Sequence, residues 1–283
     1  MLSPRGALQD TCTRSGTTGS EMAPTKLKSG LIYTHLTKAP TNAPTTAPTT
    51  ITAWLLHLQN AVLFLRLTRE SSEATRSNRT SGRGWLKAHN IIIRLGAHNI
   101  REWSVNVLDI QVSHIRQHPD FQMNTHMNDI AVLRLERPVT FNKYIRPVCL
   151  PERPVETYFS KTAVATGWGT LKFGGPSSNV LREVELIVWN NTDGNQRFTQ
   201  PITEVFLCAG AKKREGDTCQ GDSGGPLMVQ TRPNQWTLIG VTSWGNGCGM
   251  RDFPGVYTRI SHFLNYIENT PSVNGYWPIS NHK

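Results

Sequence analysis

Short apolar runs that alternate with turn residues limit the folds open to this chain from about Trp85 onward. The runs are Ile91–Ile93, Ile130–Leu133, Ala163–Ala165, Val184–Val188, Leu227–Val229 and Leu238–Val241. Turn signals such as Pro119-Asp120 and Gly174-Gly175-Pro176 separate them. Several short strands at such spacing indicate an all-β sandwich or barrel. Only residues 263–267 differ, because their apolar side chains stand at helical spacing and predict a terminal helix.

The first third of the chain has a different composition. Residues 1–50 are rich in Thr, Ser, Pro and Gly, and Ala-Pro-Thr recurs every four residues from Ala39. Such a segment buries too little apolar surface to offset the entropy of ordering. We therefore expect a disordered linker, either a spacer between modules or a stretch with no role. Residues 51–83 are ambiguous and allow a short helix, so the globular domain is predicted over 84–270, with a tail over 271–283.

Charge and composition exclude several classes of function. The net charge is +10, and residues 1–83 carry 10 Lys and Arg against 4 Asp and Glu. Because no run of five basic residues accompanies this charge, we expect no nucleic-acid partner. No apolar run reaches the roughly 18 residues of a membrane helix, so no membrane span is expected. Metal-ligand spacings and phosphate-binding glycine loops are also missing from the sequence, so we expect no metal and no cofactor.

Three features bear on the cellular compartment. The five cysteines contain no C-x-x-C and leave at least one thiol over if the others pair. The sequons Asn78-Arg79-Thr80 and Asn190-Asn191-Thr192 suit a secreted chain, although such tripeptides are frequent by chance. Residues 1–7 lack the apolar stretch of a signal peptide.

The stretch Gly221–Pro226 carries the most chemical information, because it places Ser223 between glycines. Small neighbours let a substrate approach the backbone closely and place N–H groups near the hydroxyl. A hydroxyl alone is a weak nucleophile, so it needs a base and an orienting acid elsewhere. Asp129, at the head of an apolar strand, offers a partly buried carboxylate for that purpose. Each feature alone is also compatible with ordinary structure, a glycine-rich turn and an Asp that caps a strand.

Together with other segments in a fixed order, these residues resemble the trypsin-like serine proteases, in particular the invertebrate clotting and clip-domain branch. The matching segments are Arg94-Leu95-Gly96-Ala97-His98-Asn99-Ile100, Asp129-Ile130-Ala131-Val132-Leu133, Arg146-Pro147-Val148-Cys149-Leu150-Pro151, Thr166-Gly167-Trp168-Gly169, Cys219–Pro226, Ser243-Trp244-Gly245 and Pro254-Gly255-Val256-Tyr257. The resemblance implies two six-stranded antiparallel Greek-key barrels with a C-terminal helix. It also implies an extracellular protein. Because no segment matches the family's first strands, the first barrel is expected to be incomplete.

The resemblance also implies a role for each matched residue. Ser223 would be the nucleophile, and Asp129 would orient the catalytic histidine. The N–H groups of Gly221 and Ser223 would form the oxyanion hole. Asp217 would form the floor of the substrate pocket and favour Arg or Lys before the scissile bond. The other residues implied to shape the pocket or pair with substrate backbone are Ser243, Trp244, Gly245 and Gly255.

The disulfides follow from the same resemblance. Cys219–Cys248 would bracket the pocket. Cys149 resembles the cysteine that ties the catalytic domain to an upstream segment, and Cys12 is its only upstream candidate. The family partner of Cys208 would stand near residue 194, which is a glycine here, so Cys208 is expected to be the odd thiol.

Two family features do not match. No Ile-Val-Gly-Gly activation site follows an Arg or Lys, so Asp222 is expected to lack the freed N-terminus that pairs with it in the family. His89 is the candidate base, but Leu86-Lys87-Ala88-His89-Asn90 keeps only Ala-His of the family motif. The single Asn90 between His89 and the next strand spans at most about 3.6 Å, which is too short for the family's loop. The weaker candidates are His98, His114, His118 and His126.

Three interpretations follow. The first is a serine endopeptidase that cleaves proteins or peptides after Arg or Lys through an acyl-enzyme at Ser223, with partners in a proteolytic cascade. The alternative is a catalytically inactive homologue that serves as a binding or cofactor module. A third interpretation is an incomplete chain in which residues 1–83 replace the true first strands.

Overall fold

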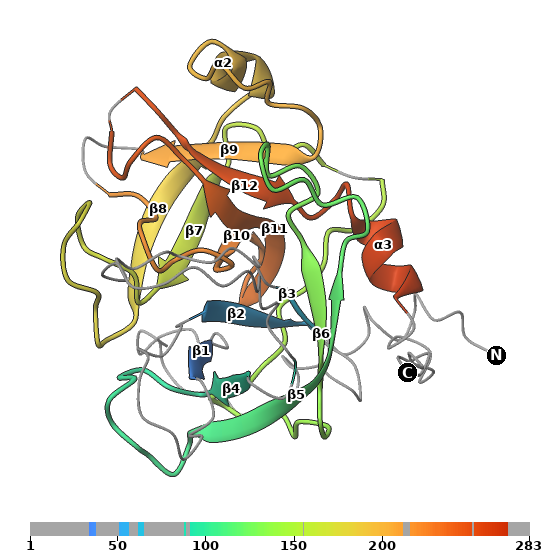
Figure 1. Cartoon of the computed structure of the whole chain (residues 1–283), viewed down its shortest axis with the longest axis vertical. Coiled ribbons are helices and arrows are strands. Elements are labelled where there is room, and N and C mark those ends of the chain that lie inside the picture. The colour runs from blue at the N-terminus through green and yellow to red at the C-terminus, as the bar shows by residue number, and fades with distance from the viewer. Residues whose placement is uncertain are drawn as a thin grey trace, which may run out of the picture.

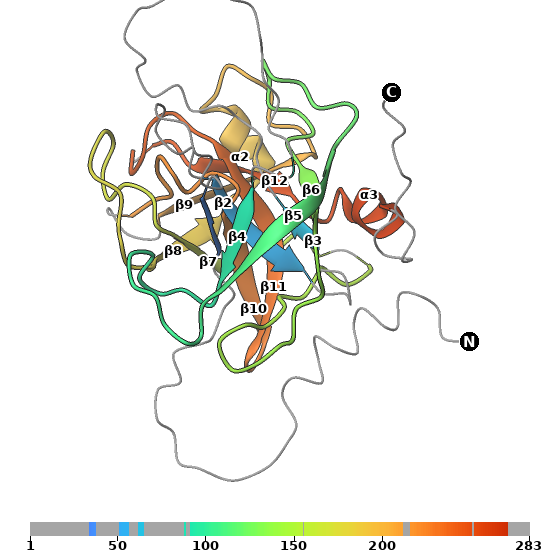
Figure 2. The same ribbon diagram turned by 60° about the horizontal axis from the view of Figure 1, so that its bottom comes forward.

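The computed structural model describes Ala88 and residues 91–154, 156–211, 216–250 and 252–270, together with the backbone of three upstream strands. In this described part, antiparallel strands form two closed barrels. The ring order is β1-β2-β3-β6-β5-β4 in the first barrel and β10-β11-β12-β9-β8-β7 in the second. Figure 1 shows the second barrel above the first, with the C-terminal helix α3 at the side, and Figure 2 shows the same arrangement turned by 60°.

The element bounds are as follows. The strands of the first barrel are β1 Thr34–Thr37, β2 Ile51–Leu56, β3 Val62–Phe64, β4 Ile92–Leu95, β5 Leu108–Gln117 and β6 Ala131–Leu135. The strands of the second barrel are β7 Thr162–Gly167, β8 Arg182–Val188, β9 Phe206–Ala211, β10 Pro226–Arg232, β11 Gln235–Trp244 and β12 Gly255–Arg259. The helices are α2 Asn191–Asn195 and α3 Leu264–Asn269.

The predicted class, two antiparallel barrels with a C-terminal helix, is confirmed. The ring of the first barrel is closed, however, where an incomplete ring was expected. Strand β1 pairs with β2 and β4, and β3 pairs with β2 and β6. β1 falls within the expected linker, and β2 and β3 occupy the segment for which a short helix was the candidate. Apolar runs this short cannot be assigned to helix or strand by periodicity alone, so pairing with partners decides their structure.

Continuous burial marks the strands that lie between two cores. In β9, residues 206 to 210 are all buried. Leu207 and Ala209 face the interior of the second barrel, whereas Phe206 and Cys208 belong to a separate cluster. Because successive side chains of a strand point to opposite faces, a strand with apolar packing on both faces loses its alternating pattern.

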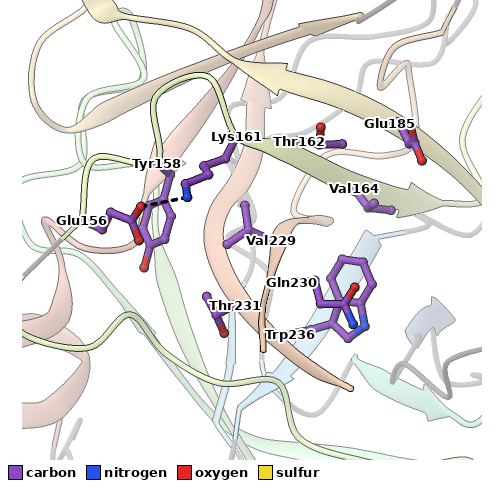
Figure 3. Close-up of a pocket in the computed structure, with 10 residues that line it drawn as sticks. All are labelled: Glu156, Tyr158, Lys161, Thr162, Val164, Glu185, Val229, Gln230, Thr231 and Trp236. Carbon is purple, nitrogen blue, oxygen red and sulfur yellow. Dashed lines mark ion pairs between the residues drawn. The ribbon is translucent and has the colours of Figure 1, made fainter. Parts of the chain in front are cut away.

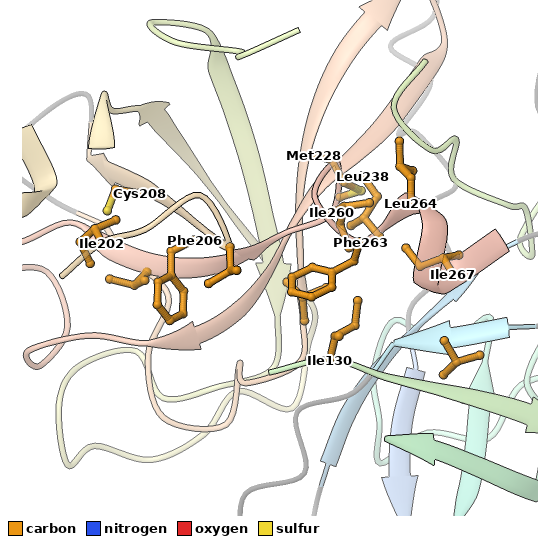
Figure 4. Packing of buried hydrophobic residues seen from close by; sticks show 14 of the residues in the cluster. Ile130, Ile202, Phe206, Cys208, Met228, Leu238, Ile260, Phe263, Leu264 and Ile267 are labelled. Carbon is orange, nitrogen blue, oxygen red and sulfur yellow. The ribbon is translucent and has the colours of Figure 1, made fainter. Parts of the chain in front are cut away.

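The separate cluster joins the two barrels and α3. It contains Ile130 and Val132 from the first barrel and Leu238 from the second. Leu264 and Ile267 attach α3 to the same cluster (Figure 4). The first barrel has its own core, built around strands β4, β5 and β6. The shared cluster therefore fixes the start of β6, where Asp129 stands, against the second barrel.

Candidate active site

Asp129 is held where the two barrels meet. Its side chain is only 2% exposed. One carboxylate oxygen, Oδ2, accepts a hydrogen bond from Ser243 Oγ at 2.7 Å. Its backbone carbonyl accepts a second hydrogen bond from Thr258 Oγ1, also at 2.7 Å. The acid predicted at the head of β6 is therefore buried and oriented by hydroxyl groups from β11 and β12 of the other barrel.

Ser223 lies in a tight turn before β10. The N–H of Asp222 donates to the carbonyl of Cys219 at 3.0 Å, and the N–H of Gly225 donates to the carbonyl of Asp222 at 2.8 Å. The N–H of Gly224 reaches across to β11 and donates to the carbonyl of Thr242 at 2.9 Å. These bonds fix the backbone on both sides of Ser223. Gly221, with a φ of +90°, supplies the left-handed conformation that the turn requires.

Asp222 is turned into the second barrel. Its Oδ1 accepts from the N–H of Gly169 at 2.8 Å, and its Oδ2 accepts from the N–H of Cys219 at 3.0 Å. A Cβ at Gly167 would lie 2.0 Å from Oδ1, and one at Gly169 would lie 2.5 Å from Cγ, so only glycine fits at both positions. Burial raises the pKa of Asp222, and its two N–H donors act in the opposite direction. Among the described residues, no ion pair involves this carboxylate.

A cavity of about 530 Å³ opens beside Ser223. Its lining includes Ser223, Ser243, Trp244, Gly245 and the Cys219–Cys248 pair. These two cysteines form a disulfide. A Cβ at Gly245 would lie 3.8 Å from the Cα of Gly255, so the two glycines face each other with little between them. Of the residues implied to shape the pocket, Ser243, Trp244 and Gly245 therefore line this cavity, and Gly255 lies beside Gly245.

Asp217 directly precedes Thr218, which lines this cavity, and is not itself among the lining residues. Its carboxylate accepts hydrogen bonds from the N–H groups of Thr218 at 2.8 Å and Gly249 at 3.0 Å. A Cβ at Gly255 would lie 3.3 Å from its Oδ1. Burial raises the pKa of Asp217 to about 6, against the pull of both N–H donors. The pKa of Tyr257 is raised by burial and, to a smaller extent, by the nearby charge of Asp217. The Tyr257 hydroxyl lies 2.9 Å from Thr218 Oγ1.

The sequence model of the trypsin family matches residues 80–267. The chain belongs to the trypsin family. It is 40% identical over 194 residues to a proclotting enzyme of Tachypleus tridentatus, a match that covers 66% of this chain and 52% of that protein. It is 39% identical over 165 residues to transmembrane protease serine 11G of Rattus norvegicus, covering 58% of this chain and 40% of that protein. A venom protease of Bombus pensylvanicus is 40% identical over 150 residues, covering 52% of this chain and 61% of that protein. The chain thus spans about half the length of such relatives.

Three cysteines of this trypsin-family chain lie outside the pocket disulfide: Cys12, Cys149 and Cys208. Cys149 is disulfide-bonded, and Cys12, its predicted partner, lies outside the described residues. Cys208 is a buried free thiol, and burial raises its pKa to about 12. A Cβ at Gly194 would lie 2.8 Å from Cys208 Sγ, so the glycine stands at the place where a partner cysteine would be.

The candidate histidines have different surroundings. His89 lies outside the described residues. His126 lines the cavity together with Ser223, and its ring stacks at 6.5 Å on Trp244. The weaker candidate His118 packs instead against Phe263 and Tyr266. The backbone carbonyl of His98 accepts a hydrogen bond from Trp168 Nε1 at 3.1 Å. His114 Nδ1 lies 3.1 Å from Ser113 Oγ, and burial lowers the pKa of His114.

Several residues of the cavity were not predicted from the sequence. Gln220 Oε1 accepts from Thr170 Oγ1 at 3.0 Å and from the N–H of Gly174 at 3.2 Å, which ties the loop after β7 to the cavity. Phe173 of that loop and Phe198 also line the cavity. Gln220 lies inside the Cys219–Pro226 segment and was open to prediction, whereas the two phenylalanines come from loops with no sequence signal.

A second cavity lies away from this site. It measures about 450 Å³ and is lined by residues of β7, β8, β10 and β11 (Figure 3). An ion pair of 3.5 Å joins Lys161 and Glu156 there. In the described part of the chain, no group of His, Cys, Asp or Glu is suited to hold a metal ion. No helix in that part is long and apolar enough to cross a membrane.

Proposed function

We propose that this chain is a serine endopeptidase that cleaves protein or peptide substrates after Arg or Lys. The observation that carries the proposal is the half-buried carboxylate of Asp217 beside the same cavity that Ser223 lines. A guanidinium or ammonium group in the cavity would pair with that carboxylate by charge-assisted hydrogen bonds. Gly245 in the cavity lining and Gly255 beside it carry no side chain that would take up space there.

Each remaining group has a place in the proposed reaction. Ser223 Oγ attacks the scissile carbonyl carbon and gives its proton to His89, which passes it to the leaving amine. The N–H groups of Gly221 and Ser223 stabilise the oxyanion that forms on the carbonyl oxygen. Asp129 orients the histidine and stabilises its protonated form. The Ser243 hydroxyl on Oδ2 supports this role, because it keeps the carboxylate in one orientation. Water then hydrolyses the acyl-enzyme.

The test is cleavage of peptide amides that carry Arg, Lys, Leu or Asp before the scissile bond. We expect cleavage after Arg and Lys only, loss of cleavage in Ser223→Ala, and loss of the basic preference in Asp217→Ala. His89→Gln should abolish turnover, whereas His126→Gln should keep it, which separates the two histidines. Cleavage that survives Ser223→Ala would overturn the proposal. An unchanged preference in Asp217→Ala would overturn the pocket assignment.

A second candidate function is an inactive homologue that binds a protein partner through the same cavity. The observation in its favour is Asp222, a buried carboxylate that forms no ion pair among the described residues. In this case no amide is cleaved, and partner binding is the same in wild type and Ser223→Ala. For either function we propose an extracellular location, which the similarity to a proclotting enzyme and to a venom protease supports.

A further inference from the structure

Two adjacent asparagines at the start of α2 have opposite surroundings. Asn191 is built into the fold: its Nδ2 donates to the carbonyls of Thr203 at 2.8 Å and Phe206 at 3.1 Å. Its Oδ1 accepts from Arg259 at 2.9 Å. All of its polar atoms are therefore used to hold α2 against the second barrel.

Asn190, by contrast, faces solvent. Its Oδ1 accepts from the N–H of Thr192 at 3.0 Å, which caps the first turn of α2. Its Nδ2 makes no hydrogen bond with any group in the described part of the chain. Thr192 is exposed as well. Figure 1 shows α2 on the outside of the second barrel, beyond β9.

We propose that Asn190 carries an N-linked oligosaccharide. Asn190-Asn191-Thr192 has the acceptor pattern, and its middle residue is not proline. In the transfer, Asn190 Nδ2 forms a bond to the anomeric carbon of a lipid-linked oligosaccharide pyrophosphate. The bond from that carbon to the pyrophosphate oxygen breaks, the lipid pyrophosphate leaves, and Nδ2 loses one proton to a base. No group is oxidised or reduced.

The folded protein has room for the glycan. The bond forms at the one polar atom of Asn190 that the fold does not use, so glycosylation leaves the cap on Thr192 intact. An open hollow of about 330 Å³ borders α2 and is lined in part by Trp189, Gln196 and Arg197. These side chains offer an indole ring, an amide and a guanidinium group to the first sugars. The inference rests on the proposed extracellular location, because the transfer takes place on the secretory route.

The experiment expresses the full chain behind a cleavable secretion signal in insect cells. Protein from the medium and from the endoplasmic reticulum is treated with peptide N-glycosidase in heavy-oxygen water, and its peptides are mapped by mass spectrometry. We expect the heavy-oxygen label at Asn190. Thr192→Ala should remove the label, and Thr192→Ser should keep it, because the serine variant retains the hydroxyl that the acceptor pattern requires and the alanine variant does not. Asn190→Asp keeps an oxygen to cap α2 and should yield folded protein that lacks one glycan. Mapping separates Asn190 from the second sequon, Asn78-Arg79-Thr80.

Two results would overturn the inference: an unlabelled Asn190 in protein from both fractions, or a label that persists in Thr192→Ala. Neither result depends on catalysis, because the map is read without an activity assay. An unlabelled but active protease would refute the glycan and keep the proposed function. A labelled protein that cleaves no substrate would refute the enzyme and keep the glycan.

Discussion

The carboxyl group of Asp217, proposed as the pocket floor, carries a cost in stability. Its pKa is raised to about 6 by burial, so at neutral pH the fold holds a charge that water would solvate better. The N–H groups of Thr218 and Gly249 offset part of this cost. A group whose folded pKa is raised is stabilising while protonated, and that contribution is lost as pH rises through the folded value.

We predict that the stability difference between Asp217→Asn and the wild type changes with pH. Below about pH 3 the wild-type side chain is largely neutral in both folded and unfolded states, so the difference is nearly constant. Between about pH 4 and 6 the wild type loses stability and the Asn variant does not. By pH 7 the variant should have gained on the order of 2 kcal/mol relative to its position at pH 4, allowing for partial exposure. Denaturant unfolding at both pH values checks this, and a difference that stays the same would contradict a buried, titrating Asp217.

Site residues that stand in contiguous motifs could be predicted from the sequence. Residues that reach the cavity only through tertiary packing could not. Ser223 and Asp129 stand in segments that were implied to form one site by their resemblance to the trypsin-like proteases. The structure buries Asp129 beneath a hydroxyl of β11 and places Ser223 at a cavity. His126 and Phe198 entered the cavity lining without a motif, because loops from two barrels meet there. Only the tertiary packing specifies that meeting.

At the scale of elements, α2 and β9 pack together at a position where the family pattern implies a disulfide and this chain has a glycine opposite a cysteine. Gly194 is buried in α2, and Cys208 is buried in β9. The position of a Cβ on Gly194, 2.8 Å from Cys208 Sγ, is close to what a disulfide requires. The resemblance to the family predicted that Cys208 lacks its disulfide partner at residue 194. The backbone positions of residues 194 and 208 nevertheless remain close enough for a disulfide.

Gly194→Cys is therefore expected to form a disulfide with Cys208. Closing a loop of about 15 residues restricts the unfolded chain by roughly 3 kcal/mol, which should raise the melting temperature by several degrees. Thiol titration of the denatured variant should find no free thiol from this pair. Gly194→Ser is the matched control: it adds atoms of similar shape against the sulfur without a bond, so it should lower the melting temperature. A Cys variant that keeps both thiols and melts below the wild type would contradict the predicted geometry.

Some strands could be predicted from the sequence and others could not. The runs around 163–165, 184–188 and 238–241 became β7, β8 and β11, because strong apolar runs bounded by turns have few other structures open to them. The upstream strands β1 and β2 were not predicted as strands. Their runs are short and lie in polar or ambiguous sequence, and their structure comes from pairing with β4 and β3.

At the scale of the whole molecule, two separate barrels must hold one site in register. Two hydroxyl groups cross the junction: Ser243 donates to the carboxylate of Asp129, and Thr258 donates to its carbonyl. Both hydroxyls belong to the second barrel and Asp129 to the first. All three residues are buried, so water is poorly placed to replace either bond.

Thr258→Val tests this junction with almost no change in shape. The valine methyl cannot donate, so the buried carbonyl of Asp129 loses the hydrogen bond from Thr258, at a cost of about 1–3 kcal/mol. Denaturant unfolding measures that cost. Thr231→Val is the control: the hydroxyl of the exposed Thr231 lies 3.0 Å from Oγ1 of the buried Thr237, so water reaches one end of that bond and its loss should cost less than in Thr258→Val. If both variants lost the same stability, the inter-barrel bond would be no stronger than a surface one. The apolar cluster around Ile130 and Leu238 would then be what aligns the barrels.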